Sequence, residues 1–326
     1  GAWTEISEKD YPAFIGAGDG CVIGGTAWDF ANDARVPRGA LDLLVIEEAG
    51  QFCMANTIAV APASTNLLLL GDPQQLPQVS QGTHPEPVDA SALGWLVDGS
   101  HTLPEERGYF LDRSYRMHPL VCAAVSRLSY DGLLGSVEKL TGARRLDGCE
   151  PGVHVLSVDH DGNSAGGPEG ADDTVGAVTR QPGPTWTDEH GSRALTQDDV
   201  LVVTPYNAQV VLLRHLLDAA GLHEVKAGTV DKFQGRQAPV VFISMVASSI
   251  GDVPRGISFL LNRNRLNVAV SRAKYAAVIV RSSMLTEYLP STPAGLVELG
   301  AFLSLTRVAE AGRAKPTIGL CDTPTP

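Results

Sequence analysis

The sequence predicts an α/β fold in which parallel sheets are covered by helices on both faces. Short, nearly continuous apolar runs alternate with stretches of helical periodicity, as expected where strands are buried on both sides. A length of 326 residues suits two domains, and 44% hydrophobic with 19% charged residues is typical of a folded protein. The longest apolar runs, such as residues 240–247, are far shorter than the roughly 18 residues that a membrane span needs, so we expect no membrane partner.

Six segments are predicted to be strands because each is nearly continuous in apolar residues. In chain order they are Cys21–Gly25, Leu41–Ile46, Asn66–Leu70, Val200–Thr204, Val240–Met245 and Ala276–Val280. Helical spacing predicts helices over 207–220 and 266–273. Pro119 is expected to begin another helix, since proline is favoured at the first helical position.

A domain boundary is expected near residues 101–108, which separates a first domain (1–105) from a second (106–314). The segment 159–197 is rich in Gly, Asp, Pro and Thr and shows little periodicity, so it predicts a long surface loop inserted into the second domain. No function is assigned to this acidic insert. Residues 315–326 are predicted to be a disordered tail.

The net charge of −12 is unevenly distributed. Residues 146–199 hold eleven acidic residues against only Arg180 and Arg193, a net charge of −9. Residues 253–281 hold six basic residues and no acidic one: Arg255, Arg263, Arg265, Arg272, Lys274 and Arg281. Because one acidic segment supplies most of the charge, the remainder is compatible with a phosphate-bearing partner.

The five cysteines are widely scattered and form no CxxC pair, which predicts neither a disulfide framework nor a zinc site. No charged start followed by an apolar stretch opens the chain, so a signal peptide is not expected. We therefore expect a cytoplasmic location.

Polar residues follow two of the predicted strands. Glu47 and Glu48 come directly after residue 46, and Gly71-Asp72-Pro73-Gln74-Gln75 follows residue 70. Ligands bind at the carboxyl ends of strands in open α/β sheets, and two acids there can hold Mg²⁺ through its water shell and orient an attacking water. Singly, the acids would suit a helix N-terminus and the Asp-Pro pair a simple turn. Two such turns at comparable strand ends favour a ligand site.

Three further clusters are polar and lie in the second domain: Phe110–Pro119, Gly228–Gln237 and Asn262–Lys274. In the last, Arg265 and Arg272 are seven residues apart, which predicts that they share one face of a helix. Each cluster by itself could be an ordinary solvated surface. Five such clusters in this order are improbable by chance.

The five clusters resemble the later motifs of superfamily 1 helicases, in the branch of the nonsense-mediated-decay RNA helicases and the DNA-replication helicase–nucleases. The strings that carry the resemblance are Tyr-Arg-Met-His-Pro (115–119), Val-Asp-Lys-Phe-Gln-Gly (230–235) and Asn-Val-Ala-Val-Ser-Arg-Ala-Lys (267–274). Thr-Pro-Tyr-Asn-Ala-Gln (204–209) and Gly-Thr-Ala (25–27) also match this branch. The resemblance covers about residues 20–285.

The resemblance implies two RecA-like lobes of the P-loop NTPase fold, the first partial and the second complete, which close on ATP and Mg²⁺. In the first lobe, Glu47 would hold the metal and Glu48 would polarise the attacking water. Gln75 would sense the γ-phosphate, with Asp72 supporting its turn.

In the second lobe, the resemblance implies that Tyr115 stacks on the adenine. Arg116 and Arg272 would reach the γ-phosphate as arginine fingers, where they stabilise the charge that develops. Gly235 and Gln237 would also contact the nucleotide.

Nucleic-acid contacts are implied for four residues: Thr26, Pro205, Tyr206 and Thr229. The partner would be single-stranded DNA or RNA, bound mainly through phosphates and stacked bases with weak sequence preference. Some relatives carry an N-terminal nuclease domain, which leaves open that the parent protein carries one as well.

The sequence departs from the family pattern at three places. No Gly-x-x-x-x-Gly-Lys-[Ser/Thr] string, the loop that cradles the phosphates, is present. Glu47 stands where the family usually has Asp, and Gln237 where it commonly has Glu. We therefore expect the C-terminal part of a longer motor, inactive by itself and dependent on its upstream half.

Two functions remain open from the sequence. The first is the distal part of an ATP-dependent helicase or translocase. The second is a non-catalytic nucleic-acid-binding or scaffold module derived from such a motor, which the missing phosphate loop favours. The retained Glu48, Gln75, Arg116 and Arg272 favour the first, because a scaffold does not need residues that face a phosphate.

Overall fold

The computed structural model describes residues 4–17, 20–78, 82, 84–158, 164–181, 183–233, 235–247, 253, 256–287 and 289–311. The chain divides into two compact units, unit 1 (1–110) and unit 2 (111–326). The boundary expected from the sequence, after residue 105, lies a few residues before this division. The predicted tail, 315–326, lies outside the described residues.

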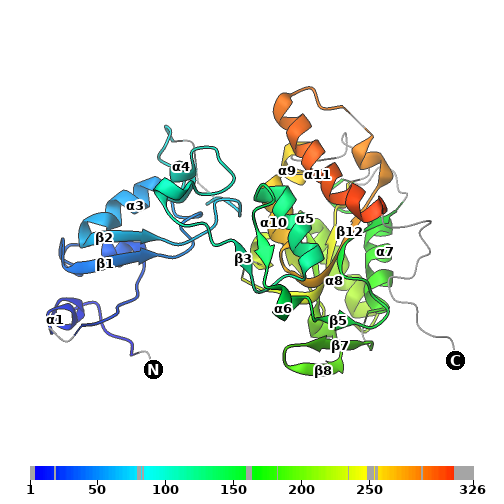
Figure 1. The fold of residues 1–326 in the computed structure, drawn as a ribbon, viewed down its shortest axis with the longest axis horizontal. Coiled ribbons are helices and arrows are strands. Elements are labelled where there is room, and N and C mark those ends of the chain that lie inside the picture. Colours follow the sequence, from blue (N-terminus) through cyan, green and yellow to red (C-terminus); the bar gives the residue numbers. More distant parts are fainter. Residues whose placement is uncertain are drawn as a thin grey trace. The chain divides into compact units, whose positions relative to one another are not determined.

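Unit 1 contains two strands that form a parallel pair, β1 and β2 (Figure 1). Its elements are α1 (Tyr11–Ile15), α2 (Ala27–Phe30), β1 (Leu41–Ile46), α3 (Met54–Val60), η1 (Ala61–Ala63), β2 (Ser64–Leu69), α4 (Ala92–Val97) and η2 (Glu105–Arg107). The predicted strand 41–46 coincides with β1, and the predicted strand 66–70 overlaps β2.

The two faces of the β1–β2 pair differ in cover. On one face, Leu44 and Ile46 are buried in a cluster with Val60 of α3 and Leu93 of α4. On the other face, Leu43 and Val45 are 50% and 46% exposed. Since Leu68 pairs with Val45 and is itself 42% exposed, an apolar surface extends across both strands.

The predicted strand 21–25 is wrong, because residues 20–26 form an irregular segment in the structure. The segment is apolar, but Val22 is 78% exposed and no strand of the described chain pairs with it. A strand requires ladder hydrogen bonds to a neighbour, which apolar composition does not provide.

Unit 2 is built on a five-stranded sheet, all parallel, in the order β10-β9-β11-β12-β6. The strands are β6 (Gly152–Ser157), β9 (Val200–Thr204), β10 (Lys226–Thr229), β11 (Ala238–Ser244) and β12 (Ala273–Arg281). Every residue of β9 and β11 is buried, which explains their continuous apolar runs. The predicted strands 200–204, 240–245 and 276–280 match β9, β11 and β12, whereas β6 and β10 were not predicted.

Two groups of helices pack against this sheet (Figure 1). Helices α7 (Pro168–Thr179) and α8 (Asn207–Ala219) contact each other and bury the sheet face that carries Val202 and Phe242. The second group contains α5 (Pro119–Ser129), α10 (Arg263–Val270) and α11 (Pro293–Ala311), which contact one another. Covered on both faces, the sheet confirms the α/β fold class predicted from the sequence.

Unit 2 also contains several smaller elements. They are β3 (Arg113–Ser114), β4 (Gly135–Ser136), α6 (Glu138–Thr141), β5 (Arg145–Leu146), β7 (Thr185–Asp188), β8 (Gly191–Ala194), η3 (Gln197–Asp199), η4 (Asp231–Phe233), α9 (Ile257–Leu260) and η6 (Ser283–Thr286). Strands β5, β7 and β8 form an antiparallel sheet in the order β5-β7-β8.

The expectation that 159–197 is a loop is wrong for its described part. This part contains α7 and the β7–β8 hairpin, and Trp186 of β7 is fully buried. Four buried residues of α7, at positions 171, 174, 175 and 178, recur at helical spacing. The signal was therefore present, but small residues carry it among glycines and aspartates.

In the described part of the chain, no helix has the length and apolar character needed to span a bilayer. Within the same residues, Cys21 is exposed and Cys53, Cys122 and Cys149 are buried, all with free thiols. Burial raises the pKa of the Cys122 thiol to about 11, so this thiol stays protonated and unreactive near neutral pH.

Candidate functional site

The turns that follow β1 and β2 lie against each other in unit 1. We call residues 47–51 the acidic turn and residues 71–75 the Gly-Asp-Pro turn. A Cβ atom built on Gly50 would lie 2.3 Å from the carbonyl oxygen of Asp72, and one on Gly71 would lie 2.6 Å from the backbone nitrogen of Ala49. Only glycine allows this approach, so the two polar turns are neighbours at the carboxyl end of the strand pair.

Asp72 organises the Gly-Asp-Pro turn through both of its carboxylate oxygens. One accepts from the Gln74 amide over 2.9 Å, and the other accepts from the Gln75 side-chain nitrogen over 3.1 Å. Glu47 and Glu48 are exposed in the neighbouring turn, where Glu48 adopts a positive φ of 54°. The structure thus presents two carboxylates to solvent beside a glutamine held by Asp72.

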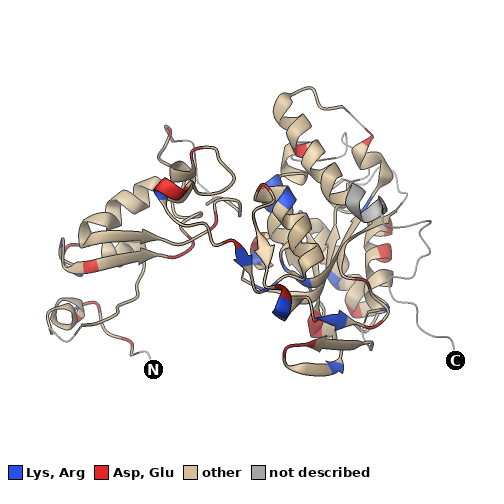
Figure 2. Cartoon of the chain, viewed as in Figure 1, with Lys and Arg blue, Asp and Glu red and all other residues tan. Residues whose placement is uncertain are grey.

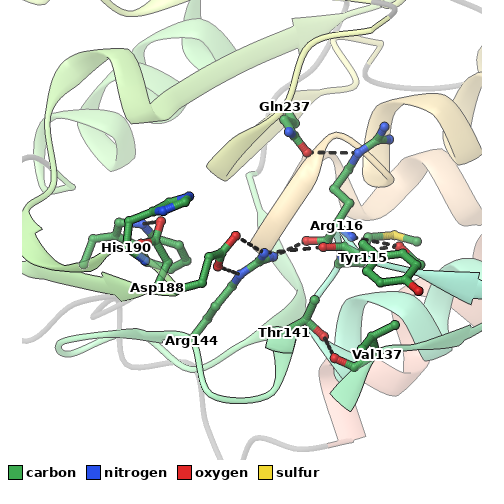
Figure 3. A network of polar contacts seen from close by, with 12 residues as sticks. Tyr115, Arg116, Val137, Thr141, Arg144, Asp188, His190 and Gln237 are labelled. Atoms are coloured by element: carbon green, nitrogen blue, oxygen red, sulfur yellow. Dashed lines mark hydrogen bonds and ion pairs between the residues drawn. The ribbon is translucent and has the colours of Figure 1, made fainter. Parts of the chain in front are cut away.

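In unit 2, Arg116 joins three segments that are far apart in the sequence (Figure 3). Its Nε donates to Oε1 of Gln237 over 3.1 Å, and its Nη1 donates to the carbonyl of Ser271 over 3.3 Å. Burial lowers the pKa of the Arg116 guanidinium, which still remains charged at neutral pH. The neighbouring Tyr115 is 67% exposed, so its ring is available for stacking.

Arg272 is buried, with 2% of its surface exposed. Its Nε donates to the Val268 carbonyl over 3.0 Å, and Nη1 and Nη2 lie 3.5 Å from the Arg236 carbonyl and the Ser271 hydroxyl. The guanidinium is therefore held by backbone of the same unit.

The expectation that Arg265 and Arg272 share a helix face is wrong. Helix α10 ends at Val270, and β12 begins at Ala273, so Arg272 lies in the connection. Arg265 instead lies over the ring of Phe259, 4.2 Å from its centroid, and 3.5 Å from an Asp231 oxygen. Seven-residue spacing predicts a shared face only where the helix continues through both positions.

Three of the predicted nucleic-acid residues lie together at the carboxyl edge of the unit 2 sheet. Pro205 and Tyr206 follow β9, and Thr229 ends β10 as the register partner of Thr204. Tyr206 is 7% exposed and its ring lies 5.6 Å from that of Phe259. Pro205 and Thr229 are half-buried at the surface beside it.

Two other predicted residues lie elsewhere. Thr26, in unit 1, caps α2: its hydroxyl and its amide both donate to Asp29 over 2.7 Å. Gly235 is exposed in unit 2 with a φ of +79° and open space around it, a conformation that favours glycine.

Charge is unevenly distributed over unit 2 (Figure 2). Acidic residues lie along α7, whereas basic residues lie on β3, on β5 and at the start of α10. Helices α7 and α10 belong to different helix groups, so the acidic residues of α7 and the basic residues at the start of α10 lie on different helix layers.

One buried charge was missed by the sequence interpretation. Arg144 is 2% exposed, pairs with Glu189 and donates to the carbonyls of Tyr115 and Arg116 (Figure 3). No local pattern could have found it, since Glu189 is 45 residues away along the chain.

Residues 95–284 match the family model described as an AAA domain. A DNA polymerase alpha-associated DNA helicase A from Schizosaccharomyces pombe is 30% identical over 78% of this chain and 39% of its own length. The DNA replication ATP-dependent helicase/nuclease DNA2 of Gallus gallus is 25% identical over 73% of this chain and 23% of its own length. A solved structure of the PRRSV helicase is 20% identical, with a TM-score of 0.36, over 73% of this chain and 34% of its own.

The chain belongs to the AAA domain family of superfamily 1 helicases, which confirms the resemblance of its motifs and the RecA-like P-loop NTPase class of its fold. It spans about two fifths or less of the length of these curated relatives.

Proposed function

We propose that this chain is part of an ATP-dependent motor that moves along single-stranded DNA or RNA. The observation that carries the proposal is the convergence in unit 2 of Arg116 with Gln237 and Ser271, which are 121 and 155 residues away. A half-buried arginine that joins distant segments beside the exposed Tyr115 ring supports a nucleotide site, because such sites combine positioned polar groups with an aromatic surface.

The side chains present suit ATP with Mg²⁺. The described residues contain no group of three or more His, Cys, Asp or Glu that could hold a metal by itself. This suits Mg²⁺, which is usually bound by one or two carboxylates together with substrate phosphates. Glu47 would supply the carboxylate, while the nucleotide–metal pair would supply the phosphoryl group that is transferred to water.

The other side chains of the site would bind and orient. Tyr115 would stack on the base, and Gln75, held by Asp72, would face the terminal phosphate. Arg116 and Arg272 would stabilise the charge that develops there. Gly235 and Gln237 would border the nucleotide, and Glu48 would accept a proton from the attacking water.

The single strand would lie across the carboxyl edge of the unit 2 sheet. Pro205, Tyr206 and Thr229 meet there, next to the basic start of α10. Thr26 would provide a contact from unit 1. Backbone and stacking contacts of this kind give weak sequence preference and strong salt dependence.

The test is ATP turnover stimulated by single-stranded DNA or RNA, measured on the full-length gene product. Arg272→Ala should lower turnover about a hundredfold or more, because an arginine finger acts on the transition state. Binding to the strand should change little. A full-length protein without stimulated turnover would refute the proposal.

A matched control tests whether the loss of any buried arginine, through its effect on fold stability, lowers ATP turnover. Arg281 is 7% exposed and bonds the Ser282 carbonyl and the Thr286 hydroxyl, far along β12 from Arg272. Arg281→Ala should keep turnover per folded molecule. If Arg272→Ala weakens turnover and strand binding equally, Arg272 serves the nucleic acid instead.

A non-catalytic binding module is the second candidate. It is favoured by the burial of Arg272 in its own unit and by the absence of a Gly-x-x-x-x-Gly-Lys-[Ser/Thr] string from these residues. This candidate predicts that ATP leaves the affinity for single-stranded DNA or RNA unchanged. The motor predicts that this affinity depends on the bound nucleotide.

A further inference from the structure

Arg144 contacts the backbone of Tyr115 and Arg116, two residues of the proposed nucleotide site. It follows α6 and precedes β5, and its guanidinium donates to the carbonyls of Arg116 and Tyr115, the latter over 3.4 Å (Figure 3). These two carbonyls belong to an irregular segment between β3 and α5. Backbone hydrogen bonds hold the flanks, where Ser114 accepts from Val137 and His118 donates to Lys274, and the Arg144 side chain bonds the two carbonyls between them.

Glu189 holds Arg144 in this orientation. Its two carboxylate oxygens accept from Nε and Nη2 over 3.1 and 3.0 Å, a bidentate pair that fixes the plane of the guanidinium. Hydrogen bonding from Arg144 is the largest effect on the Glu189 carboxyl and lowers its pKa, so the carboxylate is charged at neutral pH. Nη1 and the second N–H of Nη2 thereby point to the carbonyl oxygens of Arg116 and Tyr115.

The hairpin that carries Glu189 is firmly anchored. Trp186 of β7 is fully buried, donates to Asp188 over 3.0 Å and packs edge-on against Tyr275 at 5.6 Å. Tyr275 in turn packs edge-on against His118 at 5.4 Å. The turn of the hairpin therefore has a defined position relative to the segment that contains Tyr115 and Arg116.

We propose that Arg144 and Glu189 are a positioning pair that sets the backbone of Tyr115 and Arg116, so that the β7–β8 hairpin takes part in nucleotide binding. The β7–β8 hairpin, which has no other assigned function, thereby becomes part of the site's support. The inference rests on the proposed function for its kinetic consequence, but its geometric consequence can be measured without ATP.

The first experiment is hydrogen–deuterium exchange on the full-length protein without nucleotide. Arg144→Lys keeps the charge but loses the planar fork. It should raise amide exchange across residues 113–118 by tenfold or more. Unchanged exchange in a folded Arg144→Lys protein would overturn the proposal, whether or not the protein hydrolyses ATP.

The matched control is Arg193→Lys. Arg193 lies on β8 of the same hairpin and makes an equally bidentate pair with Asp199, at 2.5 and 2.6 Å, but it bonds neither Tyr115 nor Arg116. Its exchange over 113–118 should match the wild type. Should Arg144→Lys fail to fold, Glu189→Gln, which keeps the shape and removes the charge, replaces it with the same expectation.

The second experiment separates positioning from general support of the fold. In stimulated ATP turnover, Arg144→Lys should raise KM for ATP about tenfold and lower kcat severalfold, and Arg193→Lys should change both less than twofold. In a Tyr115→Ala background, Arg144→Lys should raise KM by a smaller factor, because one of the two side chains that it positions is gone. An equal rise in both backgrounds would overturn the proposal.

The proposed motor function and the Arg144–Glu189 positioning pair can be refuted independently of each other. A wild-type protein that does not hydrolyse ATP refutes the motor, while increased exchange in Arg144→Lys still supports the pair as the support of residues 115–116. A wild type that turns over ATP, with an Arg144→Lys protein of unchanged KM and kcat, refutes the positioning pair and leaves the motor intact.

Discussion

The side chains of Arg116 and Arg272 are each held by neutral acceptors. Arg116 bonds Gln237 and Ser271, and Arg272 bonds the Val268 carbonyl, all within unit 2. In the proposed motor, each would exchange these neutral acceptors for charged phosphate oxygens, which form stronger hydrogen bonds with a guanidinium. Gln237 therefore holds Arg116 with a neutral acceptor.

His118 makes the stability of unit 2 depend on pH. Burial, followed by the charges of Arg145 and Arg144, lowers the pKa of this imidazole to about 4. Its Nδ1 accepts from the Leu120 amide and caps α5, a role that needs the neutral ring. The unfolded chain takes up the proton near pH 6.5, and the folded chain does so only near pH 4.

Stability from His118 is therefore complete above pH 6.5 and is lost as the pH falls toward 4, by about 3 kcal/mol in total. His118→Asn keeps a helix cap without titrating. We expect its unfolding free energy to fall less between these pH values than that of the wild type, measured by urea unfolding with far-UV circular dichroism. Parallel curves for the two proteins would contradict the assignment.

At the scale of elements, close backbone approach brings the turns of unit 1 together. Gly50 and Gly71 permit the acidic turn to touch the Gly-Asp-Pro turn, and neither glycine has a positive φ. The requirement is therefore for space and not for backbone freedom.

Gly50→Ala should destabilise unit 1 by about 1–3 kcal/mol, because its Cβ would collide with the Asp72 carbonyl. It should also reduce ATP turnover by displacing Gln75. Gly24→Ala is the control, since open space surrounds that position in the same unit. Scanning calorimetry checks the stability, and equal melting of the two variants would show that the turns are not in contact.

Strands were predicted correctly where apolar residues run on with few interruptions, and were missed where polar or small residues interrupt the run. Strands β1 and β9 have the predicted bounds because their residues are apolar with few interruptions. Strand β10, Lys226–Thr229, is short and contains lysine and glycine, so its pairing with β9 left no sequence signal. Helix α7 was missed because its buried residues are small.

At the scale of the whole molecule, the meeting of Glu48 and Gln75 with Arg116 and Arg272 around one nucleotide stays a prediction. The first two belong to unit 1 and the last two to unit 2. Each unit has a local arrangement suited to its part of the site. ATP turnover in the full-length protein is the measurement that tests whether the residues of both units act on one nucleotide.

The open face of the β1–β2 pair predicts that this chain associates when isolated. Leu43, Val45, Leu68 and Leu70 form an apolar surface, each 42–50% exposed. Surfaces and strand edges of this kind bind other copies. Light scattering should show mass that rises with concentration, and a monodisperse monomer would contradict the prediction.

The double variant Val45→Thr/Leu68→Thr tests whether this face is responsible. Threonine keeps β-propensity and removes apolar surface, so association should weaken at least severalfold in sedimentation experiments. Val211→Thr is the control, because Val211 is 72% exposed on α8 in unit 2. Equal effects of both changes would place the contact elsewhere.

The sequence by itself determined the α/β class, the strand ends that carry polar turns, and the family, because apolar periodicity and short motifs are local properties of the chain. Only the tertiary structure decided which partners those side chains take: Arg116 on Gln237, Arg272 on Val268, and Arg144 on Glu189. The physical reason is that a buried or half-buried guanidinium must find acceptors wherever the packing brings them, and here they lie up to 155 residues away.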